Sequence, residues 1–296
     1  MSKESPLYKY AYFLPAPRLS TSPFTSVNAL LSGFLCKDRF NLLNKYSEFR
    51  MDTEADPIPT PFTEPVSISD LIDARAVELL SRNQQIVVQY SGGVDSTVAL
   101  IALMKHLPEN EWDRITLFYD EGGIEENPEF WSMLNLTKIR KTLLLPSEFV
   151  EAMREDDYDL IVSGRCADAL FGPNIHVMVP NAYHLPWLDG IREAFKVIPR
   201  TKISDTSLEV IEAVYSDYAK AFGLTLDQFC EFAWLFNWGV KWGHVANFTN
   251  LQLAGSKNTN KGVAFFDTLD FQRWSLSRFD TLHEANIYKD TRLYKK

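Results

Sequence analysis

The feature that most constrains the fold of this chain is a regular alternation of short apolar runs and helix-forming segments from residue 67 onwards. The run IVVQY at 86–90 is rich in β-branched residues, which is typical of strands buried on both faces of a parallel sheet. Each such run is followed by a segment with helical spacing of its apolar residues. This alternation predicts an α/β fold, in which a parallel sheet carries helices on both faces.

The expected strands lie at 86–90, 115–122, 139–145 and 159–164. The expected helices lie at 69–82, at 96–107, from Asn127 onwards and at 147–154. After Pro180 the pattern becomes helical, with capping-box sequences at Thr206–Glu209 and Thr225–Gln228. We expect the apolar stretch FCEFAWLFNW (229–238) to be buried. The chain then divides into an irregular N-terminal segment (1–65), an α/β domain (66–178) and a helical C-terminal region (179–296).

The bulk composition excludes several classes of protein. A chain of 296 residues with 46% hydrophobic content can bury a large core, and no apolar stretch reaches the roughly 20 residues that span a bilayer. The net charge of −9 argues against a mainly electrostatic nucleic-acid binder. Cys36, Cys166 and Cys230 form no CxxC pair, which is typical of a reduced protein with buried thiols. The first residues do not have the pattern of a secretory signal, so we expect no such signal. We expect a cytoplasmic protein without a membrane or nucleic-acid partner.

The stretch SGGVDST (91–97) lies between an expected strand and an expected helix, where open parallel sheets bind their ligands. Gly92 and Gly93 allow the backbone to approach a ligand, and successive N–H groups before a helix form an anion cradle. Three hydroxyl-bearing side chains add hydrogen-bond donors: Ser91, Ser96 and Thr97. The carboxylate of Asp95 suits this site if a Mg²⁺ ion lies between it and a phosphate. The sequence therefore predicts a site for phosphate and magnesium.

Two common phosphate loops do not fit this stretch, because it has neither the lysine of GxxxxGK[ST] nor the glycine spacing of GxGxxG. The structural alternative is a glycine-rich turn in which Asp95 or Ser96 is the N-cap of the helix. At ordinary residue frequencies, a chance S-G-G-x-D-S in a chain of this length is roughly a one-in-a-few-thousand event. The phosphate interpretation is therefore favoured.

The loop SGGVDS resembles the pyrophosphate loop of the N-type ATP pyrophosphatases, a superfamily that includes asparagine, GMP, NAD and argininosuccinate synthetases. Its members bind ATP, cleave it between the α and β phosphates and transiently adenylate a substrate. A second stretch, VSGRCADALFG (162–172), is similar to the segment SGxGADELFGG of asparagine synthetases and β-lactam synthetases. The resemblance covers roughly residues 66–290, and it implies an adenine nucleotide α-hydrolase-like fold.

The resemblance also implies roles for individual residues. Ser163 and Gly164 match the pair that contacts the nucleotide, and Gln89 falls where the backbone meets the adenosine. Asp168 matches the second magnesium ligand, beside Asp95. Both motifs end strands that we expect to be neighbours, so the two carboxylates can face one Mg²⁺ ion. Taken alone, Asp168 is better explained as a helix-capping residue, and it is the pairing with Asp95 that favours the metal role.

Weaker likenesses follow towards the C-terminus. AFFDTLDFQRW (264–274) resembles the segment PFLDxRLVEF, with Phe265 and Asp267 aligned. Lys289, in YKDTRL, then corresponds to a lysine that stabilises negative charge as the adenylate forms. Lys241 and Lys261 are alternative candidates for that role, and a solvated lysine explains Lys289 equally well.

Three positions depart from the family pattern. Arg165 replaces a glutamate, Cys166 replaces a glycine and Ala169 replaces the glutamate after the metal-binding aspartate. Arg165 is a candidate catalytic residue that binds a phosphate through its bidentate donors. The same reversal of charge is also compatible with altered chemistry or with lost catalysis. We interpret Cys166 as a packed thiol, because no base lies near it in the sequence.

The expected function is therefore an ATP- and Mg²⁺-dependent ligase of the asparagine synthetase type, which adenylates a carboxylate or carbonyl and then forms a C–N bond. Ser2 stands where glutamine-dependent asparagine synthetases carry a cysteine nucleophile, and some 65 irregular residues precede the sheet, so we expect a chain without a glutaminase domain. We expect the nitrogen to come from free ammonia, from an amine substrate or from a separate ammonia-supplying subunit. The alternatives are an enzyme of this superfamily that modifies a nucleotide or RNA base, and a non-catalytic ATP-binding protein.

Overall fold

The computed structural model describes residues 14–15, 34–35, 59–82, 84–145, 148–155, 157–172, 179, 181–197 and 205–279. Within these ranges it does not describe the side chains of residues 14, 15, 34, 35, 197, 207, 210, 240, 241, 244, 247 and 251. Lys289 lies outside the described residues, as does most of the segment 1–65.

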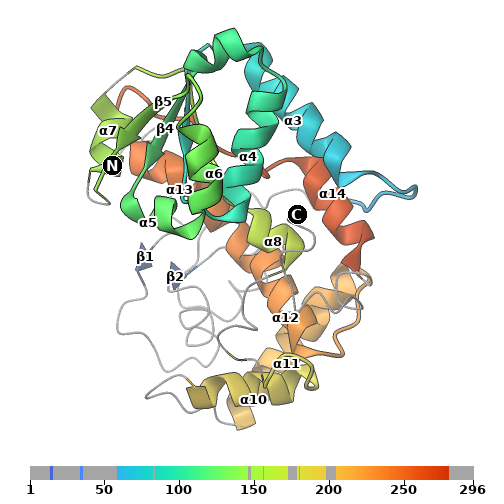
Figure 1. Ribbon diagram of the computed structural model, residues 1–296. Helices are drawn as coiled ribbons and strands as arrows, with labels where there is room; N and C mark the ends of the chain where they lie inside the picture. Colours follow the sequence, from blue (N-terminus) through green and yellow to red (C-terminus); the bar gives the residue numbers. More distant parts are fainter. Residues whose placement is uncertain are drawn as a thin grey trace.

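The fold is built on a five-stranded parallel sheet with the order β5-β4-β3-β6-β7 (Figure 1). The strands are β3 (Ile86–Gln89), β4 (Ile115–Tyr119), β5 (Arg140–Leu143), β6 (Leu160–Ser163) and β7 (Gly262–Ala264). The first four confirm the predicted strands. The fifth, β7, comes from the region in which only helices were expected, and it pairs in parallel with β6. The sheet therefore draws on both the α/β segment and the C-terminal region.

The helices of the α/β part are α3 (Ile68–Arg82), α4 (Val94–Lys105), η2 (Glu109–Arg114), α5 (Glu121–Glu126), α6 (Pro128–Leu134), α7 (Phe149–Glu155) and α8 (Ala167–Phe171). The later helices are α10 (Trp187–Val197), α11 (Asp205–Ala221), α12 (Phe229–Leu235), η3 (Phe236–Lys241), α13 (Trp242–Leu253) and α14 (Leu269–Ser277). A separate two-stranded ladder pairs β1 (Leu14–Pro15) with β2 (Phe34–Leu35).

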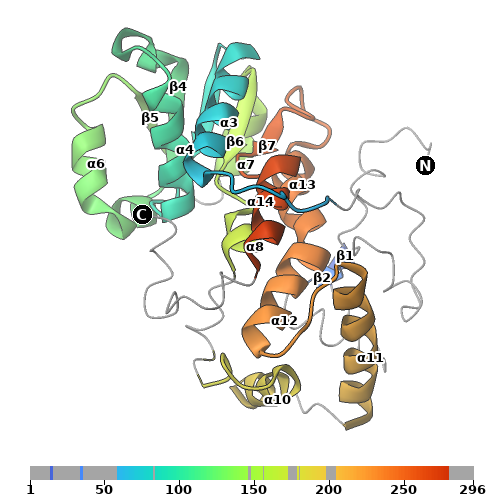
Figure 2. The same ribbon diagram turned by 90° about the vertical axis from the view of Figure 1, so that its right-hand side faces the viewer.

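Helices cover both faces of the sheet, as the sequence predicted. Ile86 and Val88 of β3 belong to the core that also holds apolar residues of α3 and α4. Val87, one residue along the same strand, belongs to a second core with Met153 of α7 and Leu253 of α13. Figures 1 and 2 show α3 and α4 on one side of the sheet and α7 and α13 on the other. Burying a valine or isoleucine fully contributes about 2 kcal/mol relative to exposing it, so this alternation along β3 stabilises both layers.

The strand order places a topological switch point between β3 and β6. From β3 the chain moves outwards through β4 to β5, and it then returns to the other side of β3 for β6 and β7. In sheets of this kind, ligands bind outside the carboxyl ends of the strands where the winding reverses. The turns that leave β3 and β6 are the two sequence motifs singled out above.

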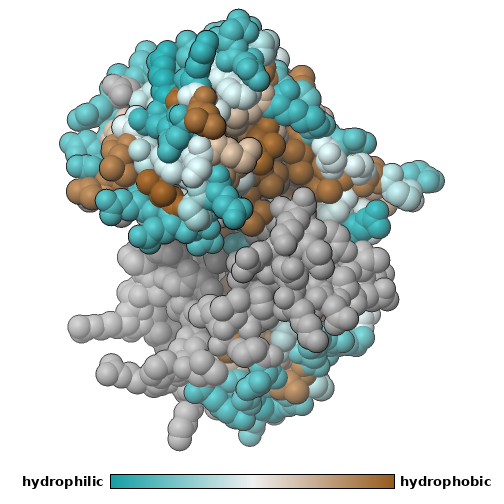
Figure 3. All heavy atoms as spheres, viewed as in Figure 1, coloured by the Kyte–Doolittle hydropathy of each residue, from teal (hydrophilic) through white to brown (hydrophobic). Residues whose placement is uncertain are grey.

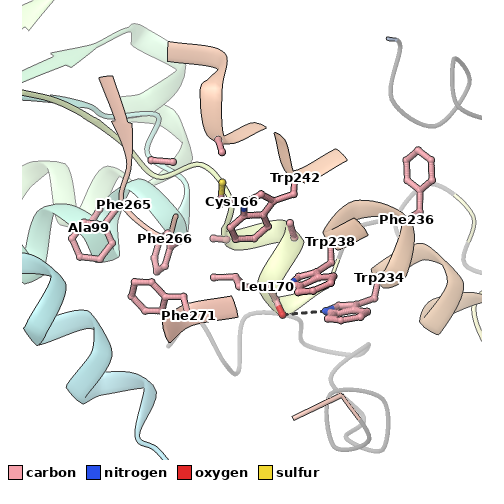
Figure 4. Packing of buried hydrophobic residues seen from close by; sticks show 14 of the residues in the cluster. Ala99, Cys166, Leu170, Trp234, Phe236, Trp238, Trp242, Phe265, Phe266 and Phe271 are labelled. Atoms are coloured by element: carbon pink, nitrogen blue, oxygen red, sulfur yellow. Dashed lines mark hydrogen bonds between the residues drawn. The ribbon is translucent and has the colours of Figure 1, made fainter. Parts of the chain in front are cut away.

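A continuous helical run, α12–η3–α13, connects the sheet to the other C-terminal helices. The buried stretch 229–238 is confirmed, because its apolar residues all lie in the core. Its N-cap is Gln228, whose N–H donates to Glu231 at 2.8 Å, so the capping box predicted at Thr225 is wrong by one turn. The reason is that residues 224–227 have no helical structure. In Figure 4, Trp234 and Trp238 stack with centroids 5.4 Å apart, and Trp234 Nε1 donates to the Leu170 carbonyl of α8 at 3.3 Å.

The surface of the α/β part is mainly hydrophilic in the view of Figure 3, with scattered apolar patches. Exposed apolar side chains of this kind are normal on folded proteins. Among the described residues, no helix is both long and apolar enough to cross a membrane.

Candidate functional site

The turn between β3 and α4 has the backbone that an anion cradle needs. Gly92 has a φ of +74°, in the left-handed region that favours glycine. Gly93 is the N-cap of α4 in an extended conformation, so no side chain caps this helix. The structural alternative, with Asp95 or Ser96 as the N-cap, is therefore wrong. The helix also begins at Val94, two residues before the predicted start, and Asp95 lies in its first turn.

The hydroxyl groups of this turn hold the loop itself. Ser96 Oγ donates to the Gly93 carbonyl at 3.0 Å and accepts from the Ser91 N–H at 3.2 Å. Thr97 Oγ1 also donates to the Gly93 carbonyl, at 2.9 Å. Ser96 and Thr97 are buried, whereas Ser91 is exposed. The sequence predicts all three hydroxyls as donors towards phosphate. In this structure Ser96 and Thr97 bond within the turn, and the exposed Ser91 has its hydroxyl 3.2 Å from the Ser96 hydroxyl.

Beneath the loop, Tyr90 is fully buried and packs against Trp131 of α6. Burial raises the pKa of the Tyr90 hydroxyl, and the neighbouring Thr97 hydroxyl partly offsets this. Tyr90 therefore stays neutral and supports the loop from inside the core.

The two sequence motifs meet at Gly164. A Cβ atom on Gly164 would lie 2.6 Å from the Ser96 nitrogen and 2.7 Å from the Asp95 carbonyl carbon. Only glycine allows this approach between the end of β6 and the first turn of α4, because real Cβ atoms are not found so close to backbone. Ser163, just before it, is buried, and its carbonyl accepts from the Phe265 N–H at 2.8 Å.

A third segment, α5, also contacts the loop 91–97. The sequence did not indicate this contact. The expected strand 115–122 ends at Tyr119, because Asp120 caps α5 by accepting from the Gly123 N–H at 2.8 Å. A Cβ on Gly92 would lie 2.2 Å from the Gly123 carbonyl oxygen. The glycine pair EGG at 121–123 is the signal that identifies this contact. Gly92 is therefore required both by its left-handed φ and by the close approach of α5.

The two predicted metal-binding carboxylates lie on the helices that follow the two turns. Asp95 is half-buried in the first turn of α4, and Asp168 is exposed in the first turn of α8. No group of three or more metal-ligating side chains exists among the residues that the structure describes. A pair of carboxylates suits Mg²⁺, which is usually held by one or two of them, with phosphate oxygens and water completing the shell. The donor set therefore fits the ion that the sequence implied.

Gln89, the last residue of β3, faces the α7 and α13 side of the sheet. Its Nε2 donates to the sulfur of Met153 at 2.7 Å, and its Oε1 accepts from the Thr249 hydroxyl at 3.4 Å. The side chain of Gln89 is thus engaged within the protein, and its backbone pairs with β4 on one side and β6 on the other.

The turn after β6 carries a strained residue and a cation. Cys166 has a φ of 75°, a left-handed conformation that costs a non-glycine residue about 1–2 kcal/mol. The family motif has glycine at this position, so the local backbone agrees with the resemblance although the side chain differs. Cys166 is 2% exposed and packs in the core near Trp242 (Figure 4), which confirms a packed thiol. The other described cysteine, Cys230, has its pKa raised by burial to about 12, so its thiol stays protonated.

Arg165 precedes this strained residue, and its side chain is exposed. The guanidinium carbon lies 4.1 Å from the centre of the Phe248 ring of α13, a cation–π contact. Desolvation by the surrounding protein lowers the pKa of Arg165 from its ordinary value. The guanidinium nevertheless stays charged at neutral pH, because arginine side chains are not deprotonated in proteins.

The structure removes one candidate lysine and leaves two untested. Lys261 pairs with Asp157 at 2.9 Å and precedes β7, so it lies at the amino ends of the parallel strands, opposite the loops. The side chain of Lys241 and the whole of Lys289 are outside the described residues. In the weaker motif, Asp267 accepts from Trp242 Nε1 at 3.1 Å and Phe265 is fully buried. Both residues of that motif therefore have structural contacts here.

Comparisons with models of protein families and with curated proteins found no match to this chain.

Proposed function

We propose that this protein is an ATP- and Mg²⁺-dependent ligase of the asparagine synthetase type, with an adenine nucleotide α-hydrolase-like fold. The observation that carries the proposal is the contact of Gly164 with the Asp95–Ser96 peptide at the switch point of the sheet. The two motifs that resemble this family lie far apart in the sequence. They meet where an open parallel sheet binds its ligand.

In this proposal the loop and the first turn of α4 hold the phosphates of ATP. Ser96 and Thr97 lock the Gly93 carbonyl, which fixes the loop in advance of binding. The uncapped N-terminus of α4 then turns N–H groups and a partial positive charge of about +0.5 towards the anion. Asp95 and Asp168 would hold Mg²⁺, and the bound ion supplies charge stabilisation to the phosphate oxygens.

The reaction that fits this arrangement has two steps. A carboxylate oxygen of the acceptor attacks the α phosphorus, the bond to the bridging oxygen breaks and pyrophosphate leaves with the electron pair. A nitrogen nucleophile then attacks the adenylated carbonyl, loses a proton to water and displaces AMP, which leaves an amide. The chain itself supplies binding and orientation in both steps. We propose free ammonia, an amine substrate or ammonia from another subunit as the nitrogen source, and a cytoplasmic location.

The test is to incubate the protein with ATP, Mg²⁺ and a panel of carboxylic acids with ammonium, and to follow the phosphorus species by NMR. The proposal expects AMP and pyrophosphate in equal amounts, and it expects Asp95→Asn to suppress both. Release of ADP and inorganic phosphate instead would contradict the mechanism.

A second candidate function is a non-catalytic ATP-binding protein. Ala169, at the position of a family glutamate, is only 4% exposed and packs in the core, so this position offers no polar group to a ligand. This candidate predicts tight binding of Mg²⁺–ATP without release of pyrophosphate across the whole panel of acids. Calorimetry together with the phosphorus spectra distinguishes the two functions.

A further inference from the structure

The charges around the proposed cradle do not balance those of a pyrophosphate group. A Mg²⁺ ion held by Asp95 and Asp168 has its charge cancelled by these two carboxylates. The loop 91–97 contains no lysine or arginine. The acidic helix α5 lies against the other side of the loop, where a Cβ on Gly92 would be 2.8 Å from the Cβ of Glu126. The partial charge at the N-terminus of α4, about +0.5, cannot neutralise a polyanion alone, so the site needs a further cation.

Within the described part of the chain, Arg165 is a cation that follows directly on the contact between the two turns. It directly follows Gly164, whose backbone lies against the first turn of α4. In the described part of the chain, its guanidinium contacts the Phe248 ring and forms no ion pair. A guanidinium that contacts an aromatic ring through its central carbon can still donate from the N–H groups along its edge. These donors match the spacing of two phosphate oxygens.

The backbone beside Arg165 supports a ligand-directed role. Cys166 is held in a left-handed conformation although it is not glycine, and strain of this kind is concentrated at binding and catalytic sites. Desolvation also lowers the pKa of Arg165, so the surrounding protein opposes its charge. An arginine held against an aromatic ring without a counter-ion is suited to receive one from a ligand.

We propose that Arg165 is a phosphate-binding residue, which holds the β and γ phosphates of ATP and the departing pyrophosphate through bidentate N–H donors while Phe248 fixes its plane. This inference rests on the proposed function, and it assigns to Arg165 the neutralising charge that the family motif, with glutamate at this position, does not provide. Reversal of the charge at position 165 is then a change in how the site is neutralised, rather than a sign of lost catalysis.

The test is calorimetric titration of the full chain with Mg²⁺–ATP, Mg²⁺–pyrophosphate and AMP as separate probes. Arg165→Gln removes a charged bidentate contact, so we expect the affinity for ATP and for pyrophosphate to fall by about 30-fold. Affinity for AMP, which lacks the β and γ phosphates, should stay within about twofold. Arg165→Lys keeps the charge but not the bidentate guanidinium, so it should lose less affinity for ATP and pyrophosphate than Arg165→Gln. Phe248→Leu should lose less affinity still. Arg82→Gln, at an exposed arginine of α3, is the control with the same change in net charge.

Each outcome separates this inference from the proposed function. Failure of the unmodified protein to bind ATP overturns the proposed function and the role of Arg165 with it. Normal ATP binding that is unchanged in Arg165→Gln overturns the role of Arg165 alone. An equal loss for AMP and for pyrophosphate, or a raised KM for the acceptor acid with ATP affinity unchanged, also overturns it. Thermal unfolding of each variant checks that the fold is retained, and Arg165→Lys carries the test if Arg165→Gln does not fold.

Discussion

The two turns that meet at the switch point are built in opposite ways. The turn after β3 is closed by its own atoms, with glycine at the crowded position and the Ser96 and Thr97 hydroxyls bonded to the Gly93 carbonyl. The turn after β6 has cysteine in a left-handed conformation and sends the Arg165 side chain outwards. The first turn therefore shapes a backbone surface, and the second adds charge to it. In the proposed site, the backbone of the two turns would bind the phosphates, and the Arg165 side chain would change how their charge is neutralised.

The largest expected effect is a difference in stability between alanine variants of two adjacent glycines in the first turn. Gly92→Ala forces a Cβ into the Gly123 carbonyl at a left-handed φ, so we expect a loss of about 3–4 kcal/mol in unfolding free energy. Gly93→Ala is the matched control, because its Cβ would meet only Ser91 Oγ at 3.4 Å, and it should change stability by less than about 1 kcal/mol. Denaturant unfolding measures both values. Equal stabilities of the two variants would contradict the packing of the loop against α5.

The next effect concerns the ligand rather than the fold. If phosphate approaches the uncapped N-terminus of α4, the added methyl group of Gly93→Ala should weaken Mg²⁺–ATP binding by about tenfold while the protein stays folded, a loss of about 1.4 kcal/mol. Calorimetric titration measures this change. Unchanged ATP affinity in a folded Gly93→Ala protein would place the phosphates elsewhere.

The strained residue of the second turn allows a comparison of two substitutions. Cys166→Ala and Cys166→Gly both remove the buried thiol, but only glycine relieves the left-handed φ of 75°. We expect the glycine variant to be more stable than the alanine variant by about 1 kcal/mol. Unfolding curves recorded under the same conditions measure the difference. An alanine variant that is the more stable of the two would show that the turn is not strained.

The smallest expected effect lies at the amino ends of the parallel strands, opposite the two turns of the proposed site. Asp159 accepts from the N–H groups of Gln85 and Gln84 at 2.9 and 2.7 Å, and these bonds lower its pKa. A depressed carboxyl pKa stabilises the fold above the ordinary value of about 3.9, and this contribution is lost as the pH falls below it. Asp159→Asn should therefore cost less than about 1 kcal/mol at pH 7, since the side chain is exposed, and nothing near pH 2. ATP affinity should not change. A loss of ATP affinity in Asp159→Asn would contradict the placement of the site at the carboxyl ends of the strands.

Much of the fold was predictable from the sequence because most of its strands have a recognisable residue pattern. Runs such as Ile86–Gln89 are β-branched and bounded by turn residues, whereas β7 has only three residues, begins with Gly262 and carries no such pattern. The position of α5 was missed because Asp120 and the following glycines also read as the end of a strand. Local composition cannot distinguish these cases, which are decided by pairing with a neighbouring strand or by capping.

The candidate site divides in the same way. Its motifs were recognisable from residue types, because glycine, serine and aspartate at that spacing suit phosphate and magnesium. The contact between Gly92 and Gly123 was not predictable, nor was the inward turn of Ser96 and Thr97 or the stacking of Arg165 on Phe248. Each of these depends on tertiary packing between segments that are distant in the sequence or on the direction in which a hydroxyl points.

The most direct test of the central claim is a crystal structure of this protein with Mg²⁺ and the α,β-methylene analogue of ATP, which resists cleavage at the bond in question. We expect the phosphates to lie against the first turn of α4 and Gly164, and Mg²⁺ to lie between Asp95 and Asp168. We expect the Arg165 guanidinium to contact the β and γ phosphates. Density for the nucleotide away from the carboxyl ends of β3 and β6, or phosphates that contact neither turn, would contradict it.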